Sequence, residues 1–114
     1  MKKNFRLKNN EEIGKIVFKR QKVSSHLYNI YFVFNQTETK IAVVAGKKCG
    51  GSIERNYQKR IIREVVRPRL AEINNTHAVI VAKDKVKETS FVEKKEVLNL
   101  MISKMIERKN NEKK

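Results

Sequence analysis

An unbroken apolar run, Ile-Ala-Val-Val-Ala, occupies residues 41–45 of this chain and limits how it can fold. A run this short predicts a β-strand, Lys40–Ala45, and a strand that is apolar at every position is buried on both faces of its sheet. The segments Leu27–Phe34 and His77–Ala82 are also rich in β-branched and aromatic residues, which favours two more strands. We therefore expect a small central sheet with helices packed on it.

Helices are predicted before, between and after these strands. Asn9 is a suitable N-cap for a first helix over Asn9–Arg20, and Ser90 with Glu93 has the spacing of a capping box for the last helix. The apolar stripe expected on that last helix consists of Phe91, Val97, Leu98, Met101, Ile102 and Met105.

The resulting order is helix, strand, strand, helix, strand, helix, which predicts a single α+β domain of the α/β sandwich type. A chain of 114 residues has room for one modest core. We assign residues 1–108 to one domain and expect the charged residues 109–114 to form a frayed tail.

Composition excludes several classes of protein. No apolar run reaches about 18 residues, and the basic N-terminus leads into no apolar segment, so neither a membrane span nor a secretory signal is expected. The single cysteine, Cys49, has no partner for a disulfide and makes no metal-ligand spacing with His26 or His77. We expect a cytoplasmic protein without a membrane partner, an obligate protein partner or a metal site of its own.

The net charge of +15 is concentrated in two blocks. Residues 1–22 hold eight Lys or Arg and two Glu, a net of +6, and residues 47–69 hold the same numbers. Residues 23–46 are neutral overall, and the last 45 residues carry a net of +3. Dense blocks of one sign indicate a surface for a polyanion, and nucleic acid is the polyanion that this pattern favours.

The second block coincides with a predicted helix over residues 53–67, which Ser52 caps and which ends or kinks at Arg67, before Pro68. At about 100° per residue, one half of its circumference is apolar and an arc of about 140° is polar and cationic. Glu54 and Glu64 fall outside the cationic arc, unlike the interleaved acids of an ordinary solvated face. The apolar half contains Ile53, Tyr57, Ile61, Ile62 and Val65, and the cationic arc contains Arg55, Asn56, Lys59, Arg60, Arg63 and Arg67.

Residues 46–64 read Gly-Lys-Lys-Cys-Gly-Gly-Ser-Ile-Glu-Arg-Asn-Tyr-Gln-Lys-Arg-Ile-Ile-Arg-Glu. This stretch resembles the arginine-asparagine-arginine signature of the bacterial ribonuclease P protein family, and the opening Phe-Arg-Leu-Lys-Asn-Asn-Glu-Glu at residues 5–12 is similar to the start of that family. The likeness covers nearly the whole chain. Tyr57 is a departure, since it stands where the motif has its second arginine. The positions that match the motif are Arg55, Asn56, Lys59, Arg60 and Arg63.

The resemblance implies a fold shared with a ribosomal protein domain, including a left-handed crossover around the Arg-rich helix. It also implies two partners, the ribonuclease P RNA and precursor tRNA. The RNA subunit would be catalytic, with Mg²⁺ held mainly by RNA, and this chain would carry no catalytic residue. The expected contacts with the catalytic RNA are Lys47, Lys48, Arg55, Asn56, Lys59, Arg60, Arg63 and Arg67.

The same resemblance implies a cleft between the first helix and the sheet for the single-stranded 5′ leader of precursor tRNA. Aromatic side chains suit this role, because unpaired bases stack on them. Strand alternation divides the aromatics of the first strand into Tyr28, Phe32 and Phe34 on one face and Tyr31 on the other, and does not say which face is open. The expected cleft residues are Ile13, Lys15, Phe18, Tyr31 and Phe32, with Phe32 favoured by the likeness to the family.

Three other functions fit the sequence less well. A ribosomal-type or generic RNA-binding protein would have the same charge but no reason for the detailed spacing of the motif. A self-sufficient nuclease needs converging carboxylates or paired histidines, which the sequence does not offer at a convincing spacing. DNA binding has no supporting helix-turn-helix or zinc-ligand pattern.

Overall fold

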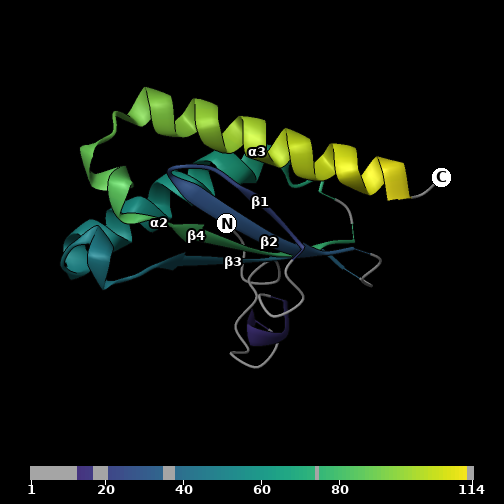
Figure 1. Cartoon of the computed structure of the whole chain (residues 1–114), viewed down its shortest axis with the longest axis horizontal. Helices are drawn as coiled ribbons and strands as arrows, with labels where there is room; N and C mark the ends of the chain where they lie inside the picture. The colour runs from purple at the N-terminus through teal and green to yellow at the C-terminus, as the bar shows by residue number, and fades with distance from the viewer. Residues whose placement is uncertain (1–12, 17–20, 35–37, 74, 113–114) are drawn as a thin grey trace.

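The computed structural model describes residues 13–16, 21–34, 38–73 and 75–112 (Figure 1). One four-stranded sheet lies at its centre, in the order β1-β2-β4-β3. Its strands are β1 (Lys22–Ser24), β2 (Tyr28–Val33), β3 (Lys40–Ala45) and β4 (His77–Ala82). Strands β1, β2 and β4 pair antiparallel, whereas β3 runs parallel to β4. The predicted mixed α+β domain is therefore confirmed.

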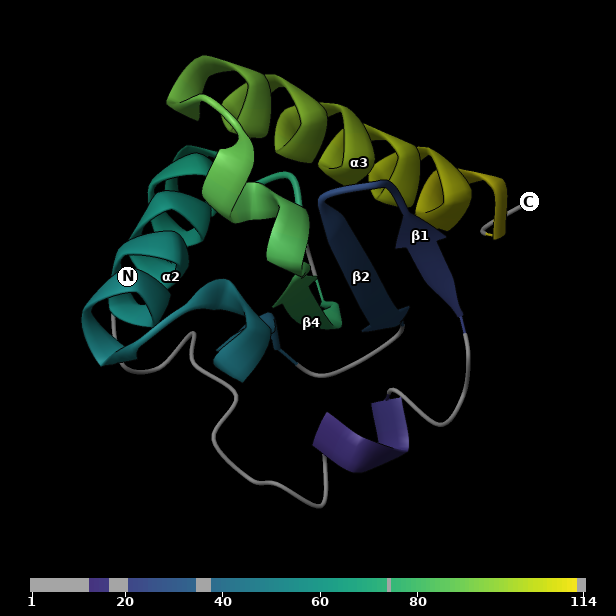
Figure 2. The same cartoon turned by 60° about the vertical axis from the view of Figure 1, so that its left-hand side comes forward.

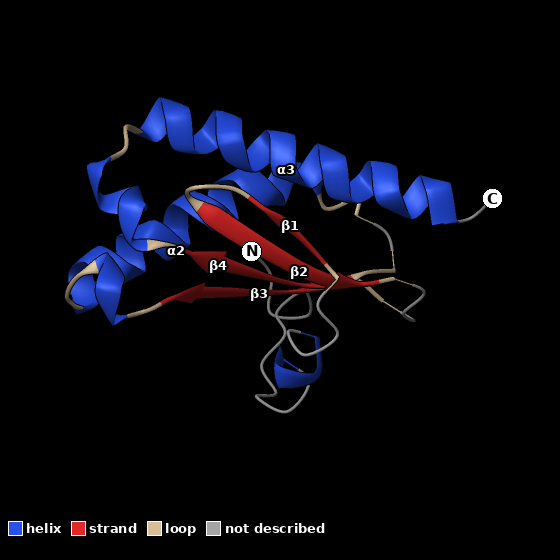
Figure 3. Ribbon diagram, viewed as in Figure 1, coloured by secondary structure: helices blue, strands red, loops and turns tan. Residues whose placement is uncertain are grey.

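Two helices cover one face of this sheet, and the described part of the N-terminal segment lies on the other (Figure 3). These helices are α2 (Ser52–Val66) and α3 (Phe91–Glu112). Even-numbered residues of β2 and β4 point into the main core beneath them, which includes Ile30, Phe32 and Ile80. A smaller cluster on the opposite face joins Ile16 to Ala42 and Val79. Strand β3 thus has apolar residues on both faces, as the run at 41–45 predicted, although it lies at an edge of the sheet.

Helix α2 is the connection between the parallel strands β3 and β4, so it crosses over one face of the sheet. It begins one residue earlier than predicted, because Gly51 and not Ser52 is its N-cap, and no side chain caps it. Gly50 has a φ of 114°, and a Cβ at this position would lie 2.9 Å from the Cβ of Glu54. A glycine is therefore required for the chain to turn into α2 at this point.

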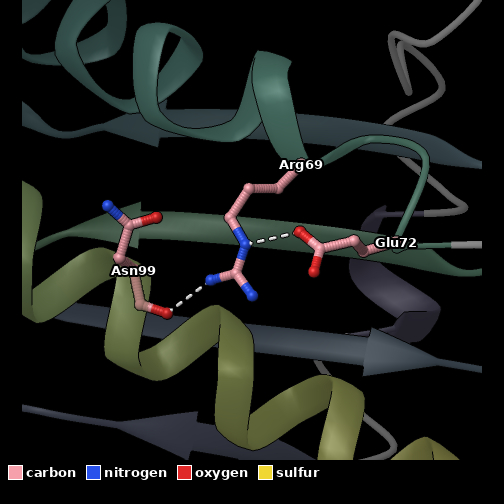
Figure 4. Close-up of polar contacts among 3 residues, drawn as sticks. All are labelled: Arg69, Glu72 and Asn99. Atoms are coloured by element: carbon pink, nitrogen blue, oxygen red, sulfur yellow. Dashed lines mark hydrogen bonds and ion pairs between the residues drawn. The ribbon is translucent and has the colours of Figure 1, made fainter.

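Helix α2 ends where Pro68 predicted an end or a kink, with Arg67 as its C-cap. Arg67, Pro68 and Arg69 form a 3₁₀ turn, η3 (Arg67–Arg69), so the chain stays helical in character beyond Arg67. Pro68 is tolerated because it occupies the first turn of η3, where a backbone N–H is not needed. The guanidinium of Arg69 then ties this turn to α3 (Figure 4): Nη1 donates to the main-chain oxygen of Asn99 at 2.7 Å, and Nε donates to Glu72 at 2.9 Å.

The last helix keeps its predicted start but not its predicted end. The hydroxyl of Ser90 accepts a hydrogen bond from the N–H of Glu93 at 3.3 Å, which confirms the cap at the beginning of α3. The tail expected to fray from residue 109 is wrong for residues 109–112, because α3 continues to Glu112. Lys109 is only 6% exposed, so the helix still packs on the domain at this residue.

Three short elements were not predicted. Strand β1 was missed because it has three residues, of which only Val23 is buried. The other two are 3₁₀ turns, η2 (Lys47–Cys49) and η4 (Asp84–Glu88). The left-handed sense of the β3-α2-β4 crossover stays a prediction from the resemblance. The predicted first helix is described only over residues 13–16, which are helical.

Candidate nucleic-acid interface

The cationic arc of α2 is set by the burial of the opposite side of the helix. Ile62 and Val66 are fully buried, and Ile61 and Val65 are 2–3% exposed, so the rotation of the helix about its axis is fixed. This places six polar or cationic side chains at the surface. Arg55, Lys59 and Arg63 are partly exposed, whereas Asn56, Arg60 and Arg67 are exposed.

Two more lysines extend the cationic surface ahead of the helix. Lys47 and Lys48 are both exposed in η2, the turn that leads to the start of α2. Cys49 anchors this turn: it is 1% exposed, and its Sγ lies 3.6 Å from the main-chain oxygens of Ala82 and Lys83. Burial raises the pKa of the Cys49 thiol, which therefore favours the neutral, structural form. All eight residues predicted to contact the catalytic RNA thus belong to one continuous segment, η2 to η3.

The members of this segment are not equally free to meet a phosphate. Arg60 pairs with Glu64 at 3.3 Å, one turn along the helix, and both side chains are well exposed. An exposed pair of this kind contributes little to stability, so Arg60 can exchange its partner for a phosphate at small cost. Arg69 belongs to the same basic block, but its side chain is only 18% exposed and is held by Glu72 and Asn99. Arg69 is therefore part of the scaffold.

A second surface lies on the sheet face opposite α2 and α3. Its members are partly buried around the cluster of Ile16, Ala42 and Val79: they are Ile13, Tyr31, Val33, Val44 and Val81. The ammonium of Lys22 lies 5.8 Å from the centre of the Tyr31 ring. An aromatic ring with a cation beside it is the arrangement that single-stranded nucleic acid uses for stacking. Of the predicted cleft residues, Ile13 and Tyr31 are brought together here, and Lys15 is exposed in the same helical segment.

The prediction that Phe32 lines this cleft is wrong. Phe32 is fully buried on the other face of the sheet, in the core beneath the helices. Its ring centre lies 4.9 Å from that of Phe34 and 6.0 Å from the guanidinium of Arg108 in α3. No base can reach it while the core is intact. Phe18, the remaining predicted cleft residue, lies outside the described residues.

The apolar half of α2 was also only partly predicted. Ile53 is 87% exposed and Tyr57 is 46% exposed, although both were assigned to the buried stripe. The position facing α3 is instead taken by Gln58, which is 1% exposed. Its amide donates to Glu54 at 2.9 Å and accepts from the Nζ of Lys94 at 3.3 Å.

Lys94 is a buried cation that sequence reasoning missed. It is 3% exposed, and its Nζ also lies 5.4 Å from the centre of the Tyr57 ring. Burial lowers the pKa of Lys94, and the charge of Glu54 partly offsets this effect. A polar Gln58 four residues after Glu54, in the middle of an apolar stripe, was the available signal that a polar partner would come from another helix.

The acidic residues near α2 do not converge on a common point. Glu54 accepts from Gln58, and Glu64 pairs with Arg60. Within the described ranges, no three His, Cys, Asp or Glu side chains are grouped so that they could hold a metal ion. No helix in the described part of the chain combines the length and the apolar character needed to cross a membrane.

Fold and surface together define a small basic α+β protein with a cationic crossover helix on one side of its sheet and, on the other, a partly exposed apolar face that carries Tyr31. A sequence model of the ribonuclease P family matches residues 1–106, and the chain belongs to this family. The likeness proposed from residues 46–64 is thereby confirmed.

Individual relatives align with this chain over most of their length. The chain is 32% identical over 107 residues to the ribonuclease P protein component of Bacillus pumilus, covering 91% of this chain and 90% of that one. It is 32% identical over 116 residues to the protein of the same name from Mycoplasmopsis pulmonis, covering 99% and 98%. The corresponding protein of Alkaliphilus metalliredigens is 30% identical over 107 residues, covering 92% and 96%.

Solved structures share the fold. The ribonuclease P protein of Thermotoga maritima superposes with a TM-score of 0.72 at 25% identity, covering 84% of this chain and 94% of that one. A Staphylococcus aureus ribonuclease P protein mutant, described as defective in mRNA degradation, superposes with a TM-score of 0.82 over 89% and 87% of the two chains. Its 22% identity supports the common fold alone.

Proposed function

We propose that this chain is the protein subunit of ribonuclease P, and that it binds two RNAs on separate surfaces. The segment from Lys47 to Arg67 binds the catalytic RNA subunit. The sheet face around Tyr31 binds the single-stranded 5′ leader of precursor tRNA and so assists its removal by the assembled endonuclease. The observation that carries the proposal is the cationic face of α2, fixed in rotation by its buried side, in a chain of this family.

Phosphate binding follows from the chemistry of that face. Arginine presents a planar fork of donors that matches phosphate oxygens, and four of the six residues on the arc are arginines. The net charge of +15 adds a long-range attraction for RNA. These contacts position the protein on a folded RNA and carry no sequence information of their own.

Leader binding follows from the second surface. Tyr31 lies partly exposed between Val33 and the cation of Lys22, on the face that α2 and α3 leave uncovered. A stack on an aromatic ring is tolerant of sequence because every base has a π-face. Such a surface suits leaders whose sequences differ from one precursor to the next.

Chemistry belongs to the RNA in this proposal. Cleavage of a phosphodiester commonly uses two metal ions that carboxylates hold together, whereas Glu54 and Glu64 are separately engaged with Gln58 and Arg60. Mg²⁺ at the scissile bond is therefore held mainly by RNA phosphates. The protein contributes affinity for the substrate and neutralises repulsion between the two RNAs.

The test is reconstitution with the RNA subunit transcribed from the same genome. The protein alone should not cleave precursor tRNA at any Mg²⁺ concentration. Added to the RNA, it should lower both the Mg²⁺ requirement and the KM for precursor tRNA, and leave the KM for a leaderless substrate unchanged. A tagged chain that captured ribosomes from cells, and no single abundant structured RNA, would instead identify a ribosomal-type protein.

A further inference from the structure

Four large apolar side chains stand exposed where α2 and α3 begin. They are Ile53, Tyr57, Phe91 and Val92, with exposures between 42% and 87%, and we call them the helix-start patch. Among the described residues only Leu100, farther along α3, is a comparably exposed large apolar side chain. Both helices begin at the left-hand end of the molecule in Figure 1, which comes forward in Figure 2. Grouped apolar side chains on a surface mark a place of contact more often than scattered ones do.

The two halves of the patch meet at one contact. Ile53 and Tyr57 are four residues apart and share a side of α2. Phe91 precedes Lys94 by three residues and shares a side of α3 with it. The Nζ of Lys94 lies 5.4 Å from the centre of the Tyr57 ring, so the Phe91 side of α3 adjoins the Tyr57 side of α2.

Tyr57 is held in place and still accessible. The buried ammonium of Lys94 occupies a position over the ring, and that ammonium is itself fixed by the side chain of Gln58 at 3.3 Å. The residue nevertheless keeps 46% of its surface in solvent. A ring that is immobilised beforehand loses little conformational entropy when a second flat group stacks on it.

The surroundings of the patch are cationic. The turns η2 and η4 pack against each other beside the start of α2, and their lysines are exposed: Lys47, Lys48, Lys85 and Lys87. Against these four lysines the two turns hold Asp84 and Glu88, a net of +2. An apolar patch that contains aromatic rings and has a basic rim fits an unpaired base on its phosphate backbone, because surfaces for single-stranded nucleic acid combine stacking rings with nearby cations.

We infer that the helix-start patch stacks an unpaired base of the RNA that the cationic face of α2 binds, with Tyr57 as the stacking ring and Phe91 beside it. This inference rests on the proposed function, because it supposes that α2 docks on the ribonuclease P RNA. It gives the half-exposed Tyr57 a role of a different kind from its cationic neighbours. Arg55, Lys59 and Arg63 contact phosphates, whereas Tyr57 contacts a base.

The two kinds of contact respond differently to salt, and this difference is the basis of the test. The affinity of the full chain for the transcribed ribonuclease P RNA is measured at several salt concentrations for the wild type, Tyr57→Phe and Tyr57→Leu. Tyr57→Phe keeps the ring and should bind like the wild type. Tyr57→Leu keeps an apolar side chain but loses the stack, and it should bind about 5- to 150-fold more weakly with an unchanged dependence of log K on log salt.

Control variants separate this result from misfolding and from general loss of apolar surface. Leu100→Ala removes an exposed apolar side chain elsewhere on α3 and should leave affinity unchanged. Phe91→Leu tests the second ring independently and should also weaken binding. Thermal unfolding of each variant establishes that the domain is intact.

Three results would overturn the inference. If Tyr57→Leu bound the RNA like the wild type, with its steep salt dependence intact, the proposed function would stand and the stack would not exist. If Tyr57→Leu reduced the salt dependence as well as the affinity, the residue would act through phosphate contacts. If the free chain formed dimers that Tyr57→Leu abolished, the patch would be an interface between copies. Absence of RNA binding by the wild type would instead contradict the proposed function itself.

Discussion

Tyr31 and Phe32 are neighbours in β2, yet their side chains lie on opposite faces of the sheet: Phe32 is fully buried beneath the helices, and Tyr31 is partly exposed on the other side. The pleat of a strand makes this separation unavoidable. The two adjacent aromatics therefore have different roles, one in the core and one at a surface.

Phe32→Ala is expected to destabilise the domain. Removing a fully buried phenylalanine leaves a cavity between β2 and the helices, and the free energy of unfolding should fall by about 3–5 kcal/mol. Chemical denaturation followed by circular dichroism measures this. A loss below about 1 kcal/mol would mean that the Phe32 site is far less tightly packed than described.

Tyr31→Ala is expected to act on the substrate. Loss of a base–aromatic stack should weaken binding of precursor tRNA to the reconstituted enzyme about 5- to 150-fold, because only the precursor carries a leader. Mature tRNA is the matched control and should bind as before. Equal weakening for the two RNAs would place the leader elsewhere.

Lys59→Ala and Arg69→Ala form a matched pair within the basic block. The wild-type affinity for the RNA should fall about a thousandfold between about 50 and 200 mM salt if about six cations meet phosphates. Lys59→Ala should reduce the slope of log K against log salt by about 0.9. Arg69→Ala should leave the slope unchanged and lower the melting temperature, because Arg69 binds Asn99 and Glu72. A reduced slope for Arg69→Ala would show that it leaves these partners for a phosphate.

Lys94 is expected to make stability depend on pH in the alkaline range. Burial lowers its pKa from the ordinary 10.5, so between the two values the unfolded chain binds more protons than the folded one. Below the lowered pKa, Lys94 is charged in the folded chain, and the cost of burying that charge is greatest there. As pH increases from the lowered pKa towards 10.5, this cost disappears and the free energy of unfolding rises. The difference between the wild type and Lys94→Met, measured by urea unfolding across this range, should grow in favour of the wild type. A difference independent of pH would contradict this account.

Glu54→Gln and Glu64→Gln should leave the chemical step intact. Each carboxylate is engaged locally, with Gln58 and with Arg60, and neither is placed to share a metal ion. Single-turnover cleavage by the reconstituted enzyme, at saturating protein, should stay within a few-fold of the wild type. Abolished cleavage with folding and RNA binding preserved would give the protein a part in the active site.

The sequence predicted strands most accurately where a continuous run of apolar residues must be buried. Strands β3 and β4 have the predicted bounds, because both are six-residue runs with apolar side chains on both faces of the sheet. The short edge strand β1 has one buried residue, which is too little pattern to recognise. The cationic side of α2 was predicted correctly, since an arc of charge cannot be buried.

The errors arose where the burial of a side chain depends on a distant part of the chain. Alternation separates Phe32 from Tyr31 but cannot say which face the helices cover, and the likeness to the family pointed to the wrong one. A helical wheel likewise cannot say where α3 will lie. It therefore assigned Ile53 and Tyr57 to the core and gave no place to Gln58, whose partner Lys94 is 36 residues away.

The cationic helix is the covalent link between the parallel strands β3, at one edge of the sheet, and β4, next to it, and it packs on both. Its side chains Ile62 and Val66 pack in the same core cluster as Ile41 of β3 and Ile80 of β4, which places all three elements in one cooperative folding unit. A ligand held by α2 thus stabilises the whole domain by mass action, in proportion to its concentration relative to Kd. In a cell, the amount of RNA available to this chain would then set how long the folded protein resists proteolysis.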